Sequence, residues 1–325
     1  MKESPLFWPC RIDKDVLFVL DETAIPERVQ YIPVANTNEA ITVIKEMKTR
    51  AFGQFLVVLS IFLVEIERGK NFADRDLCIK IGQIAEALNK SRPTFPFAEV
   101  TSIVVNWAKT ALETHQDLKA FVVKNINGYL QGVKYSRLDR VKRIAEVIKD
   151  GDSILTHCNV SGELAMAAAI GMEQNKKVKF YATETRPYFQ GAKLTAWELK
   201  NVGADVTLIA DNAVGYVMAN KLVNKVIVGS DRNCANGDFA NKIGTYQIAV
   251  LAKEFNLPFY VLTQPSNKIA SGADIPVEIR DENELLRYEG KKSIKGHVKG
   301  FYPGFDVVPH ELVTGGHIAL QMDRK

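Results

Sequence analysis

The second half of the chain alternates short apolar runs with longer segments of helical pattern. The helix-like segments occupy 162–173, 190–201, 213–219 and 240–255. The β-like runs lie at 154–157, 179–183, 205–209, 225–229 and 258–262. Strands and helices that alternate at this spacing are typical of a doubly wound parallel sheet with right-handed crossovers. The sequence therefore predicts an α/β protein with a doubly wound parallel sheet in its C-terminal half.

The first half of the chain follows a different pattern. Residues 16–34 hold short β-like runs broken by two prolines, which indicates a small hairpin or meander. From about residue 38 to residue 148 the pattern is helical. The most apolar stretch, Ala51–Ile66, is too short to span a bilayer and predicts a buried core helix. We expect a smaller, mostly helical N-terminal domain at 1–135, a linker helix at 136–150 and the domain with the parallel sheet at 151–325.

Composition limits the kinds of partner that the chain can have. A net charge of +4, without a long run of Lys or Arg, argues against a nucleic-acid footprint but suits a small phosphorylated substrate. The four cysteines are widely spaced and form no C-x-x-C pair, which argues against a zinc site or a disulfide framework. The N-terminus carries charges where a secretion signal would be apolar. We expect a cytoplasmic protein that binds neither nucleic acid nor membrane.

Two loops that follow predicted strands carry groups able to move protons. Cys158 follows the first strand and precedes a helix near Ser161, whose N–H groups would favour a thiolate. Asp238 lies in an Asn-Gly-Asp turn before the last predicted helix, and Asp231, which ends the preceding strand, is its rival. Either carboxyl, if shielded from water, would have a raised pKa and could donate a proton at neutral pH. Taken alone, a structural thiol and a helix N-cap are the commoner roles of such residues.

Binding of a phosphate group would require backbone amides and cations. Asn241 and Lys242, at the start of the last predicted helix, would form a good anion site. Arg50, Arg92 and Gln190 are further donors near loop positions. No G-x-G-x-x-G or G-x-x-x-x-G-K-[ST] pattern follows any predicted strand, so a nicotinamide or nucleotide cofactor has little support.

Long motifs make a specific resemblance visible. They are THCNVSGELA (156–165), ETRPYFQGAKLTAWEL (184–199) and GSDRNCANGDFANKIGTYQIAVLAKEFNLPFYV (229–261). On these motifs the chain resembles the methylthioribose-1-phosphate isomerase family, which also holds ribose-1,5-bisphosphate isomerases and regulatory subunits of a translation initiation exchange factor. The resemblance implies a mostly helical N-terminal domain, a Rossmann-like C-terminal domain, a homodimer, and neither a metal nor a nucleotide cofactor.

The same resemblance assigns roles to individual residues. It places the family's catalytic cysteine on Cys158 and its catalytic aspartate on Asp238, and thereby selects Asp238 over Asp231. The phosphate-contacting positions that it implies are Arg50, Arg92, Gln190, Asn241 and Lys242.

The implied reaction converts an aldose 1-phosphate into a ketose 1-phosphate, with 5-methylthioribose 1-phosphate of methionine salvage as the leading substrate. Because C1 carries a phosphate, the ring cannot open as a free sugar does. Our hypothesis is that Asp238 is the acid that assists ring opening, while Cys158 moves the proton between C2 and C1. In a competing mechanism a hydride shifts directly and Cys158 handles the O2 proton. The alternatives are 5-deoxyribose 1-phosphate or ribose 1,5-bisphosphate as substrate, or a non-catalytic regulatory subunit.

Two segments depart from the family pattern. Ala51-Phe52-Gly53 stands where the isomerases usually read Gly-Ala-Pro after the arginine, and Phe95-Pro96-Phe97 follows Arg92-Pro93-Thr94 in place of small and polar residues. We expect both departures to affect which substituent the site accepts on C5 of the sugar. An aromatic-lined pocket would suit a methylthio or deoxy C5 better than a second phosphate.

Overall fold

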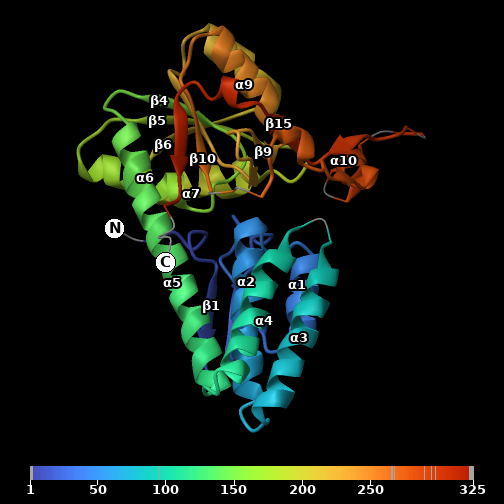
Figure 1. The fold of residues 1–325 in the computed structure, drawn as a ribbon. Helices are drawn as coiled ribbons and strands as arrows, with labels where there is room; N and C mark the ends of the chain where they lie inside the picture. The colour runs from blue at the N-terminus through green and yellow to red at the C-terminus, as the bar shows by residue number, and fades with distance from the viewer. Residues whose placement is uncertain are drawn as a thin grey trace. The chain divides into compact units, whose positions relative to one another are not determined.

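The structure of the protein is a computed structural model that describes residues 3–93, 95–264, 266, 268–288, 290–293, 295–296 and 298–321. It divides into two compact units, shown in Figure 1. The N-terminal unit is Pro5–Tyr135, and the C-terminal unit is Ser136–Lys325 together with Met1–Ser4. Thr94 of the Arg-Pro-Thr motif and the outermost residues of the predicted domains, 1–2 and 322–325, lie outside the described residues.

The N-terminal unit begins with a three-stranded antiparallel meander. Its strands are β1 (Cys10–Asp13), β2 (Val16–Leu20) and β3 (Tyr31–Val34), and β2 lies in the middle. The meander predicted over 16–34 is therefore confirmed, with β1 as an additional strand. Pro33 pairs with Phe18 on the edge strand β3, where a missing N–H is tolerated.

Helices make up the rest of this unit, and α2, α3 and α4 lie side by side in Figure 1. The helices are α1 (Thr37–Lys45), α2 (Ala51–Arg68), α3 (Asp74–Ser91), α4 (Phe97–Glu113) and α5 (Leu118–Val147), which continues into the C-terminal unit. No helix among the described residues is long and apolar enough to cross a membrane.

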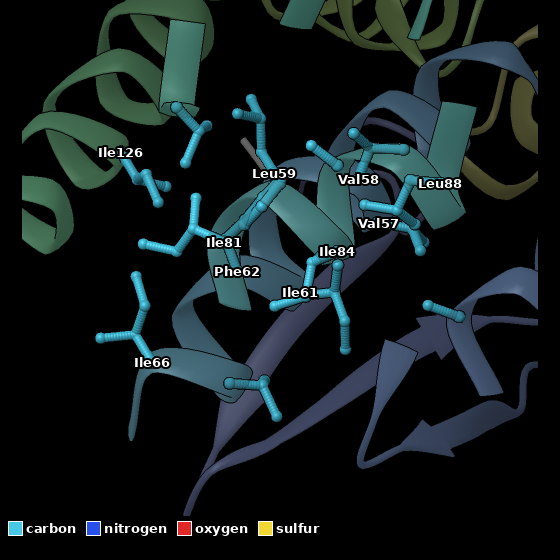
Figure 2. Packing of buried hydrophobic residues seen from close by; sticks show 14 of the residues in the cluster. Val57, Val58, Leu59, Ile61, Phe62, Ile66, Ile81, Ile84, Leu88 and Ile126 are labelled. Carbon is cyan, nitrogen blue, oxygen red and sulfur yellow. The ribbon is translucent and has the colours of Figure 1, made fainter. Parts of the chain in front are cut away.

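The core of the N-terminal unit forms around α2. Figure 2 shows side chains of α2 and α3 pointing toward one another, with Ile126 of α5 beside them. Val57, Leu59 and Phe62 are almost fully buried, which confirms the prediction of a core helix over 51–66. Each such side chain contributes about 1.5–3 kcal/mol of hydrophobic stabilisation.

The C-terminal unit is built on a six-stranded parallel sheet with the order β16-β10-β7-β4-β5-β6. The strands are β4 (Ser153–Thr156), β5 (Lys179–Thr183), β6 (Asp205–Ile209), β7 (Lys225–Val228), β10 (Phe259–Thr263) and β16 (Gly316–Ala319). Numbered along the chain, this is the 3-2-1-4-5-6 order of the Rossmann fold, so the predicted fold class is confirmed. The five predicted strands are all present, whereas β16 was not predicted.

The strand order fixes where a ligand should bind. From β4 the chain proceeds outward to β5 and β6, and from β7 it proceeds in the opposite direction to β10 and β16. The order therefore reverses between β4 and β7. In open parallel sheets ligands bind at such a switch point, outside the carboxyl ends of the strands.

Helices follow the strands of this sheet. They are α6 (Glu163–Glu173), a π-helical turn η1 (Gly191–Ala196) continued by α7 (Trp197–Asn201), α8 (Val214–Ala219) and α9 (Thr245–Glu254). Helices α8 and α9 pack on strands β4, β7 and β10 through a common apolar cluster that includes Val217, Ile248 and Val226. This packing confirms the alternating strands and helices read from the sequence.

The helix predicted over 240–255 is wrong at its start. Phe239–Lys242 forms strand β9, which pairs with β8 (Arg232–Asn233) and β15 (Phe305–Val308) in a small antiparallel sheet. Helix α9 begins only at Thr245. Asn241 and Lys242 therefore lie on a strand and not at a helix N-terminus. The pairing strand β15 is distant in the sequence, so the local pattern of residues could not reveal it.

A buried ion cluster supports the loop between β4 and α6. The Glu163 carboxylate accepts hydrogen bonds from Arg137 Nε at 2.7 Å and Arg140 Nε at 2.6 Å, and all three side chains are buried. Burial alone would raise the pKa of Glu163, but the two guanidinium groups hold it below its usual value. Arg137 also donates to the Ser161 carbonyl at 2.7 Å. Removing one partner from such a buried cluster costs about 3–5 kcal/mol of unfolding free energy.

Candidate active site

The main chain of Cys158 is held firmly at the carboxyl end of β4. Its N–H donates to Thr185 Oγ1 at 3.0 Å, and its carbonyl accepts from Thr195 Oγ1 at 2.5 Å. Both threonines are buried, while Cys158 itself is half-buried. The thiol is therefore carried by a fixed segment of backbone beside the switch point of the sheet.

Strained backbone gathers in the loops that follow β4 and β5. Cys158, Ser161, Thr185 and Phe189 have φ angles of 64°, 51°, 62° and 59°, in the left-handed region that residues other than glycine rarely adopt. Thr185 is β-branched, and its N–H is held by Asp211 Oδ1 at 2.6 Å. Such residues cost about 1–3 kcal/mol each and concentrate at functional sites. The strain thus favours a functional role for these loops.

Asp238 does not have the environment of a proton donor. Its carboxylate accepts hydrogen bonds from Asn236 Nδ2 at 2.8 Å and from the N–H groups of Gly272 and His310, each at 2.9 Å. His310 Nδ1 is also within hydrogen-bond distance, 3.0 Å from Oδ1 of the same carboxylate. Burial opposes ionisation, but these hydrogen bonds hold the pKa of Asp238 well below its usual range. The raised pKa expected for a carboxyl shielded from water is therefore not found at Asp238, which is an ionised group that joins three loops.

Asp231 lies closer to the switch point along the chain. It comes three residues after the end of β7, and β7 pairs in parallel with β4 through Val226 and Leu155. The two loops therefore leave neighbouring strands at the same edge of the sheet, one with Cys158 and the other with Asp231. The N–H of Asp231 donates to the Ala240 carbonyl at 2.8 Å, and the residue is exposed.

Gln190 lies at the start of the π-helical turn η1 after β5. Its side chain is buried, and its Oε1 atom has no hydrogen-bond partner among the described residues. The following Gly191 packs closely on β5, because a Cβ there would lie 1.8 Å from the Thr183 carbonyl oxygen. Short π-helical turns recur at functional sites. A buried acceptor without a partner can bind a hydroxyl group of a ligand.

Lys242 is enclosed by aromatic rings. Its Nζ atom lies 5.6 Å from the ring of Tyr188, 5.7 Å from that of Tyr302 and 5.1 Å from that of Phe305, and it donates to Tyr302 Oη at 3.2 Å. Burial raises the pKa of Tyr302, and charge on Tyr188 and Cys158 adds to the rise. Lys242 is thus a buried cation that contacts the phenol of Tyr302.

Asn241, the neighbour of Lys242, is also buried on β9. Its Nδ2 atom donates to Thr245 Oγ1 at 3.0 Å, at the start of α9. Cys158 and Gln190 thus follow strands of the parallel sheet at its carboxyl edge. Asn241 and Lys242 lie on β9 of the small antiparallel sheet, directly before Ile243, whose carbonyl oxygen contacts His157.

Arg50 and Arg92 belong to the N-terminal unit. Arg50 precedes α2, and its N–H donates to Glu22 Oε1 at 3.0 Å. Arg92 follows α3, and its Nη1 donates at 2.9 Å to Oε1 of Gln54, which lies in the first turn of α2. The two arginines therefore lie at the same end of α2.

The aromatic departures in the N-terminal unit have structural partners. Phe52 packs against Trp8 and Phe55, with ring centroids 5.8 and 6.0 Å away. The Arg92 guanidinium lies 5.0 Å from the Phe95 ring. Phe97 is fully buried in the core, so it is not available to line a ligand pocket.

Two hollows open on the C-terminal unit. The larger, about 520 Å³, is lined by Arg143, Lys225 and Tyr260 and lies where β7 begins, away from the Cys158 loop. The smaller, about 380 Å³, is lined by His157, Arg186 and Tyr302 among others. Only the smaller hollow borders the loops at the carboxyl edge, so size alone does not identify the site.

Sequence reasoning missed the residues that hold the site together. Thr185 and Thr195 lie in the long motif 184–199, but their hydrogen bonds to Cys158 depend on a left-handed turn that no local pattern predicts. His157, which directly precedes Cys158, is almost fully buried, and its two ring nitrogens contact Thr183 and Ile243.

Comparison with known proteins adds a second kind of observation. The model of a family described as the Initiation factor 2 subunit family matches residues 54–316. A protein named methylthioribose-1-phosphate isomerase from Thermosipho africanus is 38% identical over 329 residues, which cover 92% of this chain and 90% of that protein. A protein of the same name from Desulforudis audaxviator is 38% identical over 328 residues, with 92% and 89% covered.

Solved structures are also similar. The crystal structure of 5-methylthioribose 1-phosphate isomerase from Pyrococcus horikoshii matches with a TM-score of 0.83 and 28% identity, covering 97% of this chain and 93% of that one. The translation initiation factor eIF-2B subunit delta from A. fulgidus matches with a TM-score of 0.78 and 32% identity, covering 95% and 93%. The mixed α/β fold is thus common to proteins named as enzymes and as initiation factors.

Proposed function

The chain belongs to the Initiation factor 2 subunit family, and on this basis we propose that it isomerises 5-methylthioribose 1-phosphate to 5-methylthioribulose 1-phosphate. The observation that carries the proposal is the thiol of Cys158, fixed on strained backbone at the switch point of the sheet. The relatives named methylthioribose-1-phosphate isomerase support the same reaction. We propose that this reaction serves methionine salvage.

The chemistry requires one group that gives a proton and one that takes a proton. An acid protonates the ring oxygen, and the bond from that oxygen to C1 breaks. The hydrogen on C2 then moves to C1, and O2 loses its proton as the C2 carbonyl forms. One proton enters and one leaves, so no oxidant or cofactor is consumed.

In this scheme Cys158 is the base. It removes the proton from C2 and returns one to C1, while the O2 proton passes to the aspartate that protonated the ring oxygen. Alternatively, it takes the O2 proton while a hydride shifts directly. Solvent deuterium found on C1 of the product supports the first route, and its absence supports the second.

We assign the acid to Asp231 in place of Asp238. Asp238 is held ionised by donors from three loops, whereas the loop that carries Asp231 leaves the strand adjacent to that of Cys158. A bound sugar would cover the exposed Asp231 carboxyl and remove water from it, which favours the protonated form that an acid needs. Cys158 with Asp238, the pair implied by the resemblance, is the alternative.

The substrate's polar groups find complementary partners at the same edge. Lys242 supplies a buried positive charge for the phosphate, and Asn241 lies beside it on β9. The free acceptor of Gln190 suits a sugar hydroxyl better than a phosphate oxygen, because two acceptors repel each other. Arg50 and Arg92 are proposed as further phosphate contacts on the resemblance alone.

An assay on three sugar 1-phosphates tests the proposal. We expect the purified chain to convert the 5-methylthio sugar with a kcat/KM at least about tenfold above that for the 5-deoxy sugar, because a pocket that recognises an extra apolar group gains about 1–3 kcal/mol. Ribose 1,5-bisphosphate should be the poorest substrate. Preference for the deoxy sugar or the bisphosphate would move the assignment to that substrate.

A regulatory subunit on the same fold is the alternative of another class, since an initiation factor subunit is also similar. A chain with that role has no need of a thiol on strained backbone at the switch point. Absence of turnover on all three sugar phosphates would favour the regulatory role.

We also propose a homodimer that works in the reducing cytoplasm. The four cysteines are free thiols. Large apolar side chains are exposed on β6, α8 and α9: Leu208, Tyr216, Tyr246 and Val250 are each at least 40% exposed. Exposed apolar surface of this kind marks protein interfaces. Sedimentation should give twice the chain mass of 36.2 kDa, and Tyr216→Glu should shift the protein toward the monomer.

A further inference from the structure

The imidazole of His157 joins three elements at the carboxyl edge of the sheet. The ring is only 2% exposed and lies between the ends of β4, β5 and β9. Its Nε2 atom lies 2.9 Å from the carbonyl oxygen of Ile243, directly after β9. Its Nδ1 atom lies 2.6 Å from the Oγ1 atom of Thr183, at the end of β5.

These two contacts determine which nitrogen carries the proton. A carbonyl oxygen can only accept, so Nε2 must donate to Ile243. Burial lowers the pKa of His157, which favours the neutral ring, and its Nδ1 is then an acceptor. The hydroxyl of Thr183 therefore donates to Nδ1.

The hydrogen bonds continue to the main chain of Cys158. Thr183 Oγ1, having given its proton to His157, can accept from Thr185 Oγ1 at 3.3 Å. Thr185 Oγ1 in turn accepts the N–H of Cys158 at 3.0 Å. Both threonines are completely buried. The chain of hydrogen bonds thus runs with one consistent direction from the Cys158 loop to the strand that carries Asn241 and Lys242.

Gly244 allows the ring to approach this strand end. Its φ of 103° is left-handed, and a Cβ there would lie 3.2 Å from both Cε1 and Nε2 of His157. A side chain at this position would push the ring away from Ile243. The close contact between the imidazole and the end of β9 therefore depends on the absence of a side chain at Gly244.

We propose that His157, neutral and protonated on Nε2, is a positioning residue that fixes the Cys158 loop relative to the Asn241–Lys242 strand through Thr183 and Thr185. The inference rests on the proposed function, in which Cys158 and Lys242 act on one substrate. The ring does not touch the reacting atoms. It sets the distance between the thiol and the anion site.

Charged groups around His157 oppose one another. Asp211 and Asp306 favour the protonated ring, while Lys242 and burial favour the neutral one. Protonation would place a hydrogen on Nδ1 and break its bond to Thr183. Because burial lowers the pKa of His157, the network should stay intact at the ordinary histidine pKa of about 6.5 and fail only at a lower pH.

Thr183→Val tests the network, because valine keeps the shape and removes the hydroxyl. We expect kcat to fall about 10²-fold, as for a displacement of about 1 Å at a reacting group, with KM within about threefold of the wild-type value. Thr183→Ser restores the hydroxyl and should recover most of the kcat. A Thr183→Val enzyme with wild-type kcat, or with a loss that serine does not rescue, would overturn the inference.

The tautomer can be measured without substrate. Nitrogen-15 NMR of the full chain, with His157→Gln used to assign the signal, should show His157 neutral and protonated on Nε2 at pH 7. A proton on Nδ1, or on both nitrogens, contradicts the network. This result decides the inference even if no sugar phosphate is turned over, whereas failure of the wild-type chain in the substrate assay concerns only the proposed function.

Discussion

Replacing Cys158 with serine should lower kcat about 10⁴-fold, the upper range for loss of a proton-transferring group. A serine hydroxyl occupies the same place but is a far weaker acid than a thiol, so it cannot exchange a proton with carbon at neutral pH. The loop should keep its shape, because Thr185 and Thr195 bind the main chain of Cys158 and not its sulfur. Steady-state kinetics and the melting temperature measure the two effects.

Cys78→Ser is the matched control. Cys78 is also a free, partly buried thiol, but it lies on α3 of the N-terminal unit. This variant should retain wild-type kcat. A Cys158→Ser enzyme within about tenfold of wild type would remove Cys158 from the proton-transfer role, since such groups contribute at least 10²-fold.

Substitution of Asp231 should affect activity, whereas substitution of Asp238 should affect stability. Asp231→Asn is expected to lower kcat about 10³-fold, because an amide cannot protonate the ring oxygen. Asp238→Asn should leave kcat near wild type but destabilise the fold by about 1–3 kcal/mol, because an amide cannot accept every donor that the carboxylate satisfies. Kinetics and thermal unfolding of both variants measure this contrast.

The pH dependence of unfolding provides an independent check on Asp238. Its folded-state pKa is depressed, so its stabilisation is present above the unfolded value of about 4 and is lost as the pH falls through the folded pKa. Asp238→Asn should remove this acid-dependent part of the stability. Loss of kcat in Asp238→Asn, with full activity in Asp231→Asn, would restore the pair that the resemblance implied.

The sheet could be predicted because its central strands are largely buried and read as short apolar runs, such as 225–229. Strand β9 could not, because its partner β15 is supplied by a segment about 60 residues further on. The position of Cys158 followed from the strand that precedes it. The ionisation state of Asp238 could not be predicted, because two of its hydrogen-bond donors, Gly272 and His310, come from loops far away in the sequence.

Helix α5 belongs to both units, so the C-terminal unit cannot be separated cleanly at the start of its first strand. The helix begins in the core of the N-terminal unit with Leu118 and Val122, and its last turns supply Arg137 and Arg140 to Glu163. The loop that holds the thiol therefore depends on residues that precede the first strand of its own sheet. A Rossmann domain excised at Gly151 would lose its internal counter-charges and leave Glu163 buried without them. A fragment of the C-terminal unit made for separate expression must therefore include the end of α5, the helix that connects it to the N-terminal unit.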